Sequence, residues 1–187
     1  IAAESGIVLV HVSSDYVFDG ASERAYSEAD ALCPLGVYGQ TKAAGDAIVA
    51  TVPRHYIVRT SWVIGEGNNF VRTMASLAER GIDPNVVNDQ VGRLTFTSDL
   101  ARGIIHLLQS GAQSGVYNLT GAGEPASWAD VAREVFSLTG HDPVRVRGIS
   151  TAEYFGAATT YVAPRPANST LDLAKVTATG FVAHDWR

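Results

Sequence analysis

The sequence predicts an α/β protein built on a Rossmann-like, mostly parallel sheet. Short apolar segments rich in β-branched residues alternate with segments of ten or more residues that have helical periodicity. This alternation is typical of βαβ units. The first segment, residues 7–12, is apolar except for His11, as expected for a strand that is covered on both faces of a parallel sheet.

The first strand is followed by a polar loop and then by an expected helix over about residues 38–50. The helix is indicated by small and apolar residues that fit a 3.6-residue period, namely Ala43, Ala44, Ala47 and Ile48. Residues 56–60 form the next expected strand. A second helix is expected over about 70–79, and Gly81 terminates it.

The later elements follow the same alternation. We expect a short strand at 85–88, a helix at 97–109, a strand at 115–120 and a further strand at 143–147. Ser127 and Asp130 have the spacing of a capping box with Asp in place of Glu, which predicts a helix from there to about Thr139. Residues after Ala152 show little periodicity, and we expect them to belong to a smaller lobe beside the sheet.

Three loops follow expected strands, at residues 13–35, 61–69 and 89–96, and all are rich in polar and aromatic side chains. Right-handed crossovers place the carboxyl ends of parallel strands at one edge of the sheet. We therefore expect the functional residues in these loops.

Composition excludes several classes of function. The chain has 187 residues, 46% of them hydrophobic, and a net charge of −5, which disfavours nucleic acid as a partner. No apolar stretch is long enough for a membrane span, and the one cysteine, Cys33, has no partner for an intrachain disulfide. We expect a cytoplasmic protein. The five histidines lack metal-ligand spacing, so no metal site is expected.

Tyr38 and Lys42 are four residues apart at the start of the first expected helix, so they share one face. A nearby ammonium group favours the tyrosinate, which suits Tyr38 to act as a general acid on a carbonyl oxygen. A surface pair without function stays open on this spacing alone. Ser14 directly follows the first strand, where a hydroxyl can bind a substrate carbonyl. Ser13 is its nearest rival, and only one of two adjacent strand residues is expected to face the substrate.

A strand followed by Ser and then by Tyr-x-x-x-Lys resembles the extended short-chain dehydrogenase/reductase superfamily. Six segments narrow the resemblance to the dTDP-4-dehydrorhamnose reductase family, over about residues 11–168. They are His-Val-Ser-Ser-Asp-Tyr-Val-Phe at 11–18, Pro-Leu-Gly-Val-Tyr-Gly-Gln-Thr-Lys-Ala-Ala-Gly at 34–45, Arg-Thr-Ser-Trp-Val at 59–63, Gly-Asn-Asn-Phe at 67–70, Asn-Asp-Gln-Val-Gly at 88–92 and Arg-Pro-Ala-Asn-Ser at 165–169.

The resemblance implies reduction of dTDP-4-dehydro-L-rhamnose by NADPH, with NADH open as an alternative. It makes Tyr38 the proton donor and Lys42 the residue that lowers its pKa and holds the nicotinamide ribose. Val12 is the third expected cofactor contact. Ser14, the third expected catalytic residue, stands where the family usually has threonine.

The expected substrate-binding residues are Ser14, Asp15, Trp62, Arg165 and Asn168. Asp15 is expected to contact the sugar, and Trp62 resembles a sugar-stacking tryptophan, although a core aromatic stays open. Arg165 and Asn168 are expected to hold the diphosphate or the base, with a plain surface turn as the alternative.

Two departures from the family pattern matter. No glycine-rich phosphate-binding turn precedes residue 7, and Gly-Ala-Gly-Glu-Pro-Ala at 121–126 only imitates one, since Pro125 removes an N–H. Leu94 stands before Thr95 where the family usually has proline.

We therefore expect a chain without its N-terminal βαβ units, inactive on its own. Residues 1–120 are expected to form the C-terminal part of a dinucleotide-binding domain. Residues 121–187 are expected to form mainly a small mixed α/β substrate-binding lobe, truncated at its end.

Other functions stay open. Related dehydratases carry Asp-Glu after the Ser or Thr, whereas here Tyr16 follows Asp15, which favours reduction over dehydration. The alternatives are another nucleotide-sugar reductase or epimerase of the same branch, and a non-catalytic regulatory subunit with this fold. A dTDP-sugar is the expected small-molecule partner, and a homodimer is left open.

Overall fold

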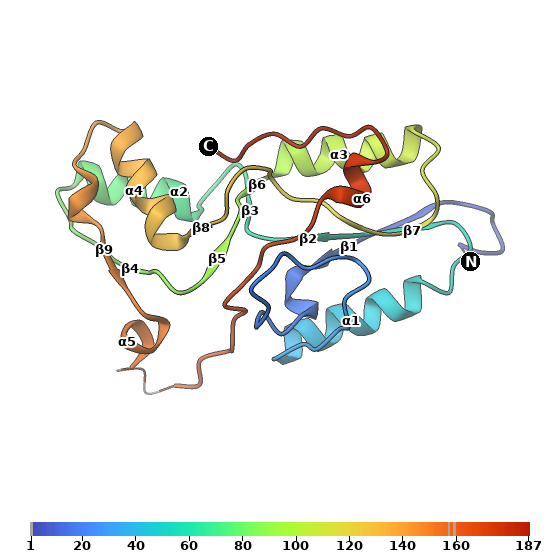
Figure 1. The fold of residues 1–187 in the computed structure, drawn as a ribbon, viewed down its shortest axis with the longest axis horizontal. Coiled ribbons are helices and arrows are strands. Elements are labelled where there is room, and N and C mark those ends of the chain that lie inside the picture. Colours follow the sequence, from blue (N-terminus) through green and yellow to red (C-terminus); the bar gives the residue numbers. More distant parts are fainter. Residues whose placement is uncertain (1, 157, 159) are drawn as a thin grey trace.

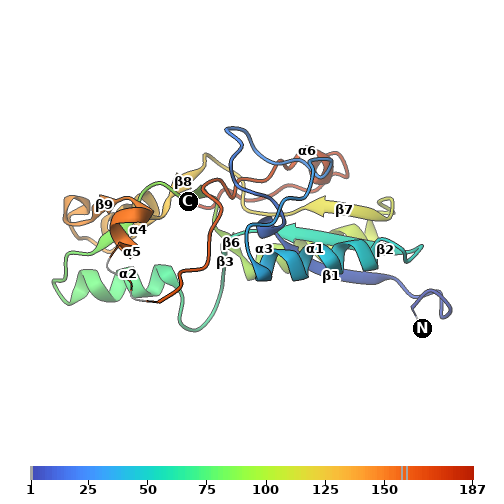
Figure 2. The same ribbon diagram turned by 90° about the horizontal axis from the view of Figure 1, so that it is seen from below.

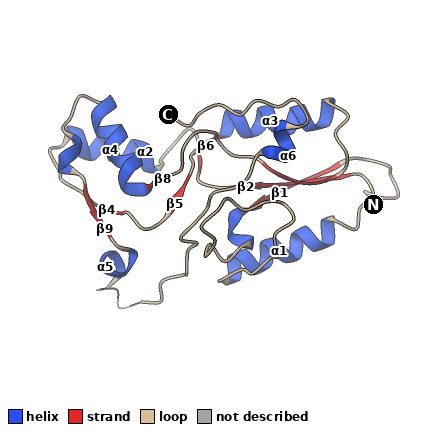
Figure 3. Ribbon diagram, in the orientation of Figure 1, coloured by secondary structure: helices blue, strands red, loops and turns tan. Residues whose placement is uncertain are grey.

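A computed structural model describes residues 2–156, 158 and 160–187. Its centre is a parallel sheet with the strand order β1 (Leu9–Ser14), β2 (His55–Thr60) and β7 (Gly115–Asn118) (Figures 1 and 3). The register runs from Leu9 opposite His55 to Ser14 opposite Thr60. The predicted α/β fold with a parallel sheet is therefore confirmed.

Helices cover both faces of this sheet. In Figure 1, α1 (Val37–Val49) lies on one side of it, and α3 (Thr97–Gln109) and α6 (Ala174–Thr177) lie on the other. The core between the sheet and α3 consists of buried apolar side chains: Tyr56, Val58, Leu107, Tyr117, Leu119, Val176 and Phe181. Because strand residues alternate between faces, Arg59 points the other way and meets Asp46 of α1.

A second group of elements packs beside the sheet. It contains α2 (Phe70–Glu79), α4 (Trp128–Leu138), α5 (Thr151–Phe155), and the parallel pair β4 (Asn85–Val87) and β9 (Arg147–Ile149). Its core includes Met74, Ala78, Val86, Ala132, Val135 and Phe136. The predicted capping box at Ser127 and Asp130 opens α4.

Short strand pairs connect the two groups. β3 (Val63–Ile64) runs parallel to β6 (Thr95–Phe96), and β5 (Val91–Gly92) runs antiparallel to β8 (Ala126–Ser127). Figure 1 shows these four strands between the sheet and the α2–α4 group, and Figure 2 shows β3 and β6 there from below. The chain crosses between the groups more than once, so each group contains residues from both sides of position 120.

The strand expected at 143–147 is wrong over most of its length. Pro143 to Arg145 form a 3₁₀ turn, η2, which the Asp142 side chain caps, and strand β9 begins only at Arg147. Proline has a fixed φ and no N–H, which suits the first residue of such a turn. Among the residues described, no helix is long and apolar enough to cross a membrane.

Candidate active site

A cavity of about 500 Å³ opens at the carboxyl ends of β1 and β2. Seven of the eight residues that the sequence predicted for the site line it: Val12, Ser14, Asp15, Tyr38, Lys42, Trp62 and Arg165. They come from β1, the following turn η1 (Asp15–Val17), the start of α1, the two-residue link between β2 and β3, and the segment before residue 166. The fold thus brings together residues that are far apart in the chain.

Tyr38 and Lys42 present the same face of α1 to this cavity. Tyr38 is 57% exposed, and its ring stands edge-on to that of Tyr16, with centroids 5.4 Å apart. The Lys42 ammonium donates a hydrogen bond to the Val12 carbonyl oxygen at 2.5 Å, which ties α1 to β1. The helix approaches η1 so closely that a side chain at Gly39 would collide with the Tyr16 carbonyl. Glycine at that position therefore sets where Tyr38 lies.

Ser14 and Asp15 form a buried hydrogen-bonded pair. The Ser14 hydroxyl donates to Asp15 Oδ1 at 3.0 Å and accepts from the Tyr16 N–H at 3.2 Å, as the cap of η1. Asp15 is only 3% exposed. Burial raises the pKa of its carboxyl to about 6, against the opposing effect of the Ser169 and Ser14 hydroxyls. A carboxyl with this pKa changes charge near neutral pH.

Ser13, the rival of Ser14, also lines the cavity. Its hydroxyl is buried and makes no hydrogen bond to the residues described. The hydroxyls of Thr60 and Ser61, at the end of the neighbouring strand, are in the same state. Buried polar groups are normally satisfied, so these three are candidates to bind a ligand or water.

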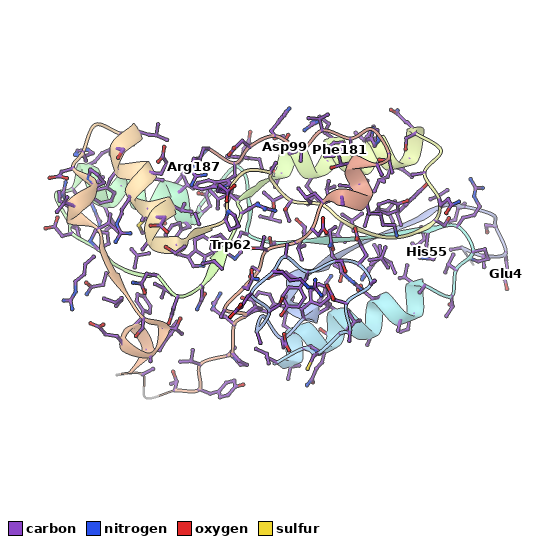
Figure 4. The ribbon with its side chains drawn as sticks, in the orientation of Figure 1. Glu4, His55, Trp62, Asp99, Phe181 and Arg187 are labelled. Carbon is purple, nitrogen blue, oxygen red and sulfur yellow. The ribbon has the colours of Figure 1, made fainter. Side chains whose placement is uncertain are left out.

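Trp62 was expected either to stack on the sugar or to be a core aromatic. In the structure it packs against another tryptophan and also lines the cavity. Its indole stacks on Trp128, with centroids 3.8 Å apart and 15° between the planes, and Phe70 stands edge-on to Trp128. Its backbone has the left-handed φ of 47°, which is rare for a residue other than glycine. Figure 4 places it where the sheet meets the α2–α4 group. One face of the ring is therefore already covered by protein.

Arg165 and Asn168 have different surroundings. Arg165 lines the cavity and donates a hydrogen bond to the Tyr16 hydroxyl at 3.2 Å. Asn168 does not reach it: its amide donates to the Ser22 and Arg24 carbonyls at 2.8 and 2.9 Å and accepts from the Thr170 N–H. The Asn168 side chain thus holds a loop in place.

A second cavity of about 360 Å³ also includes Arg165. Its other lining residues are mainly apolar and aromatic, and they include Met74, Gln90, Trp128, Tyr154 and Phe155. Sequence reasoning did not single out Tyr16, Gln90, Tyr154 or Phe155. Tyr16 and Gln90 lie inside the motifs at 11–18 and 88–92, so their place in these motifs could have identified them as site residues. Tyr154 and Phe155 lie within the stretch after Ala152 that shows little periodicity, so the sequence offers no signal for them.

The residues present fit one end of a nicotinamide cofactor. Val12, Tyr38 and Lys42 share the open cavity, and Lys42 has donors for a ribose. The glycine turn at 121–126 does not offer a phosphate site, because C-terminal residues cover it: Ala122 donates to His184, and the Trp186 indole donates to Glu124. Among the described residues, Val12, Tyr38 and Lys42 are therefore the ones that would hold the nicotinamide end of such a cofactor.

Comparison with known proteins decides the family. The family model described as RmlD substrate binding domain matches residues 1–187. The chain belongs to the RmlD family. It is 45% identical over 159 residues to a dTDP-4-keto-6-deoxy-D-glucose reductase of Streptomyces niveus, covering 83% of this chain and 54% of that protein. It is 40% identical to the dTDP-4-dehydrorhamnose reductase of Aggregatibacter actinomycetemcomitans, covering 96% of this chain and 63% of that protein.

Solved structures agree with the RmlD assignment. A dTDP-4-dehydrorhamnose reductase of Clostridium acetobutylicum superposes with a TM-score of 0.89 at 38% identity, covering 99% of this chain and 64% of that one. The Bacillus anthracis reductase, solved in complex with NADP, superposes with a TM-score of 0.86 at 33% identity, covering 99% and 63%. This chain spans less than two thirds of each of these RmlD relatives.

Proposed function

We propose that the protein reduces the 4-keto group of a dTDP-linked 6-deoxysugar, with dTDP-4-dehydro-L-rhamnose as the substrate and NADPH, or NADH, as the reductant. The observation that carries this proposal is the convergence of Ser14, Tyr38 and Lys42 on one cavity. A hydroxyl, a phenol and an ammonium are the groups that reduction of a carbonyl requires.

Each of these residues has a role in the proposed reaction. Bound NADPH supplies a hydride to C4 of the sugar. Tyr38 donates its phenolic proton to O4 as that oxygen gains charge, and Ser14 orients the carbonyl. The Lys42 ammonium stabilises the negative charge left on the Tyr38 oxygen and binds the nicotinamide ribose in place of the Val12 carbonyl.

The remainder of the substrate extends from the first cavity into the second. Arg165 lines both, and a guanidinium group binds phosphate oxygens in a bidentate manner. The apolar and aromatic lining of the second cavity, with the Gln90 amide, suits a pyrimidine base and its ribose. In this arrangement Trp62 lies beside the sugar.

Dehydration is the less favoured chemistry, because Tyr16 stands where a second acidic residue would follow Asp15. Reduction of a different 4-keto sugar is the main alternative, since the Streptomyces niveus relative is named for a 4-keto-6-deoxy-D-glucose. A cytoplasmic location, a homodimeric state and the absence of nucleic-acid or membrane partners remain predictions.

The decisive experiment supplies the complete gene product with deuterium-labelled NADPH and, separately, two 4-keto sugars. These are dTDP-4-dehydro-L-rhamnose and dTDP-4-keto-6-deoxy-D-glucose. We expect the label at C4 of dTDP-L-rhamnose, as shown by mass spectrometry and NMR. If only the product of dTDP-4-keto-6-deoxy-D-glucose carries the label, that sugar is the substrate and dTDP-4-dehydro-L-rhamnose is not. Labelling of neither by a folded protein would favour a regulatory subunit.

A further inference from the structure

The hydrogen-bonding capacity of Ser14 is almost fully used inside the protein. A hydroxyl has one hydrogen and two lone pairs. One lone pair accepts from the Tyr16 N–H at 3.2 Å, and the hydrogen points to Asp15 Oδ1 at 3.0 Å. When Asp15 is ionised, Ser14 therefore has only a lone pair left for the cavity. A ketone oxygen also offers only lone pairs, so the two groups cannot form a hydrogen bond.

A proton on Asp15 reverses this bond. The carboxylic acid then donates to the second lone pair of Ser14, and the serine hydrogen becomes available to the cavity. Ser14 keeps its bond from Tyr16, so its oxygen stays in place while its hydrogen changes direction. The same side chain is an acceptor toward the cavity in one state of Asp15 and a donor in the other.

The surroundings of Asp15 favour the neutral acid. The side chain is 3% exposed, its Oδ1 accepts from the Ser14 hydroxyl, and its buried Oδ2 has no hydrogen-bond partner among the described residues. The Ser169 hydroxyl lies near enough to lower the pKa, but burial has the larger effect and raises it. No ion pair joins it to any residue that the structure describes. The titratable groups around the cavity are Tyr16 on η1, Tyr38 and Lys42 on α1, and Arg165. Arg165 donates to the Tyr16 hydroxyl and Lys42 donates to the Val12 carbonyl, and neither cation forms an ion pair with the Asp15 carboxylate.

From this geometry we infer that Asp15, in its neutral form, is a positioning residue that makes the Ser14 hydroxyl a donor toward the substrate carbonyl. The inference rests on the proposed reduction. The Asp15 proton is not consumed, because Tyr38 supplies the proton that O4 keeps. Reduction is then fast when Asp15 is protonated and slows as it ionises. The raised pKa of Asp15, about 6, places this change close to neutral pH.

The test compares kcat/KM between about pH 5 and about pH 9 for wild type and Asp15→Asn. An asparagine amide donates to Ser14 Oγ at every pH. We expect wild-type kcat/KM to fall about tenfold per pH unit above the Asp15 pKa. We expect Asp15→Asn to lack this fall and therefore to exceed wild type by about 100-fold near pH 8, two pH units above the Asp15 pKa of about 6. The same profile in both proteins, or one constant loss at all pH values in Asp15→Asn, would overturn the inference.

A double mutant distinguishes an effect of Asp15 that acts through Ser14 from a general disturbance of the site. Ser14→Ala removes the group on which Asp15 acts, so adding Asp15→Asn to Ser14→Ala is expected to leave the pH dependence of kcat/KM unchanged. A change in the pH profile caused by Asp15→Asn in the absence of the serine hydroxyl would contradict positioning through Ser14.

A second readout does not depend on turnover. Carboxyl NMR of the labelled protein, assigned by the signal missing in Asp15→Asn, is expected to show Asp15 titrating well above an ordinary aspartate and shifting in Ser14→Ala. Titration in the ordinary range would overturn the inference even in an active enzyme. If wild type reduces neither keto sugar at any pH, the proposed function fails. The NMR titration then still decides whether Asp15 and Ser14 are coupled.

Discussion

The centroids of the stacked indole rings of Trp62 and Trp128 are 3.8 Å apart, and this contact joins the link between β2 and β3 to the first residue of α4. Gly92 leaves room for the stack, since a Cβ there would lie 2.8 Å from the Trp62 ring. The position of the cavity-lining indole thus depends on two residues that line no part of the Tyr38–Lys42 cavity themselves.

We expect Gly92→Ala to displace Trp62 and to lower the free energy of unfolding by about 1–3 kcal/mol, the usual cost of overpacking. Near-UV circular dichroism reports the stacked pair, and its signal is expected to fall in Gly92→Ala and in Trp128→Leu. Trp186→Phe is the matched control, because that indole binds the Glu124 carbonyl instead. A signal lost equally in Trp186→Phe would show that the stacked pair is not its source.

The Arg59–Asp46 pair fixes α1 against the sheet. Its atoms are 3.0 Å apart and both side chains are buried. Asp46→Ala leaves a buried, unpaired guanidinium, so we expect a loss of about 3–5 kcal/mol in unfolding free energy, measured with urea. Asp83→Ala, which breaks an exposed pair with Arg145, is expected to cost less than about 1 kcal/mol. Similar costs for the two variants would contradict the argument from burial.

Asp15 also makes stability depend on pH. Its folded-state pKa of about 6 lies above the ordinary value of 3.8, so the folded protein binds more protons between them. Wild-type stability is therefore expected to fall as the pH rises through this window. Asp15→Asn removes this dependence. The free energy of unfolding of Asp15→Asn, relative to that of wild type, is therefore expected to rise by about 2–3 kcal/mol from about pH 4 to about pH 7.5. Urea unfolding at both pH values measures it, and a constant difference would show that the Asp15 pKa is not raised.

Arg165 and Asn168 were predicted as a pair, but their contacts predict different phenotypes. Arg165→Ala is expected to weaken dTDP binding by about tenfold or more, measured by calorimetry, because it removes the phosphate-binding guanidinium. Asn168→Ala is expected to lower stability by about 1–3 kcal/mol through the carbonyls it leaves unpaired. Its effect on the dTDP affinity is expected to be small. Equal losses of affinity in both variants would place Asn168 at the ligand.

Local patterns predicted the elements that local physics determines. The apolar run of β1, the period of α1 and the capping box of α4 are properties of neighbouring residues, and the structure has all three. The strand expected at 143–147 failed because Pro143 and the Asp142 cap favour a turn. The pattern of neighbouring residues does not show where strand pairing begins, because β9 pairs with β4, which lies some sixty residues earlier in the chain.

The sequence predicted those residues of the site that belong to recognisable motifs. Tyr38, Lys42 and Ser14 were found from chemistry and spacing, and the cavity contains all three. The Trp62–Trp128 stack and the second cavity depend on how α2, α4 and α5 pack against one another. No pattern within a single segment reports such contacts, so the sequence left them open.

The central claim is that Tyr38 protonates a substrate carbonyl in this cavity. The most direct test follows NADPH absorbance after the complete gene product meets dTDP-4-dehydro-L-rhamnose, for wild type, Tyr38→Phe and Tyr161→Phe. Tyr161 is 85% exposed and lines neither cavity, so it is the matched control. We expect rapid oxidation by wild type and Tyr161→Phe, and a loss of at least about 100-fold in Tyr38→Phe. Oxidation by Tyr38→Phe at the wild-type rate would contradict the assignment of Tyr38 as the proton donor.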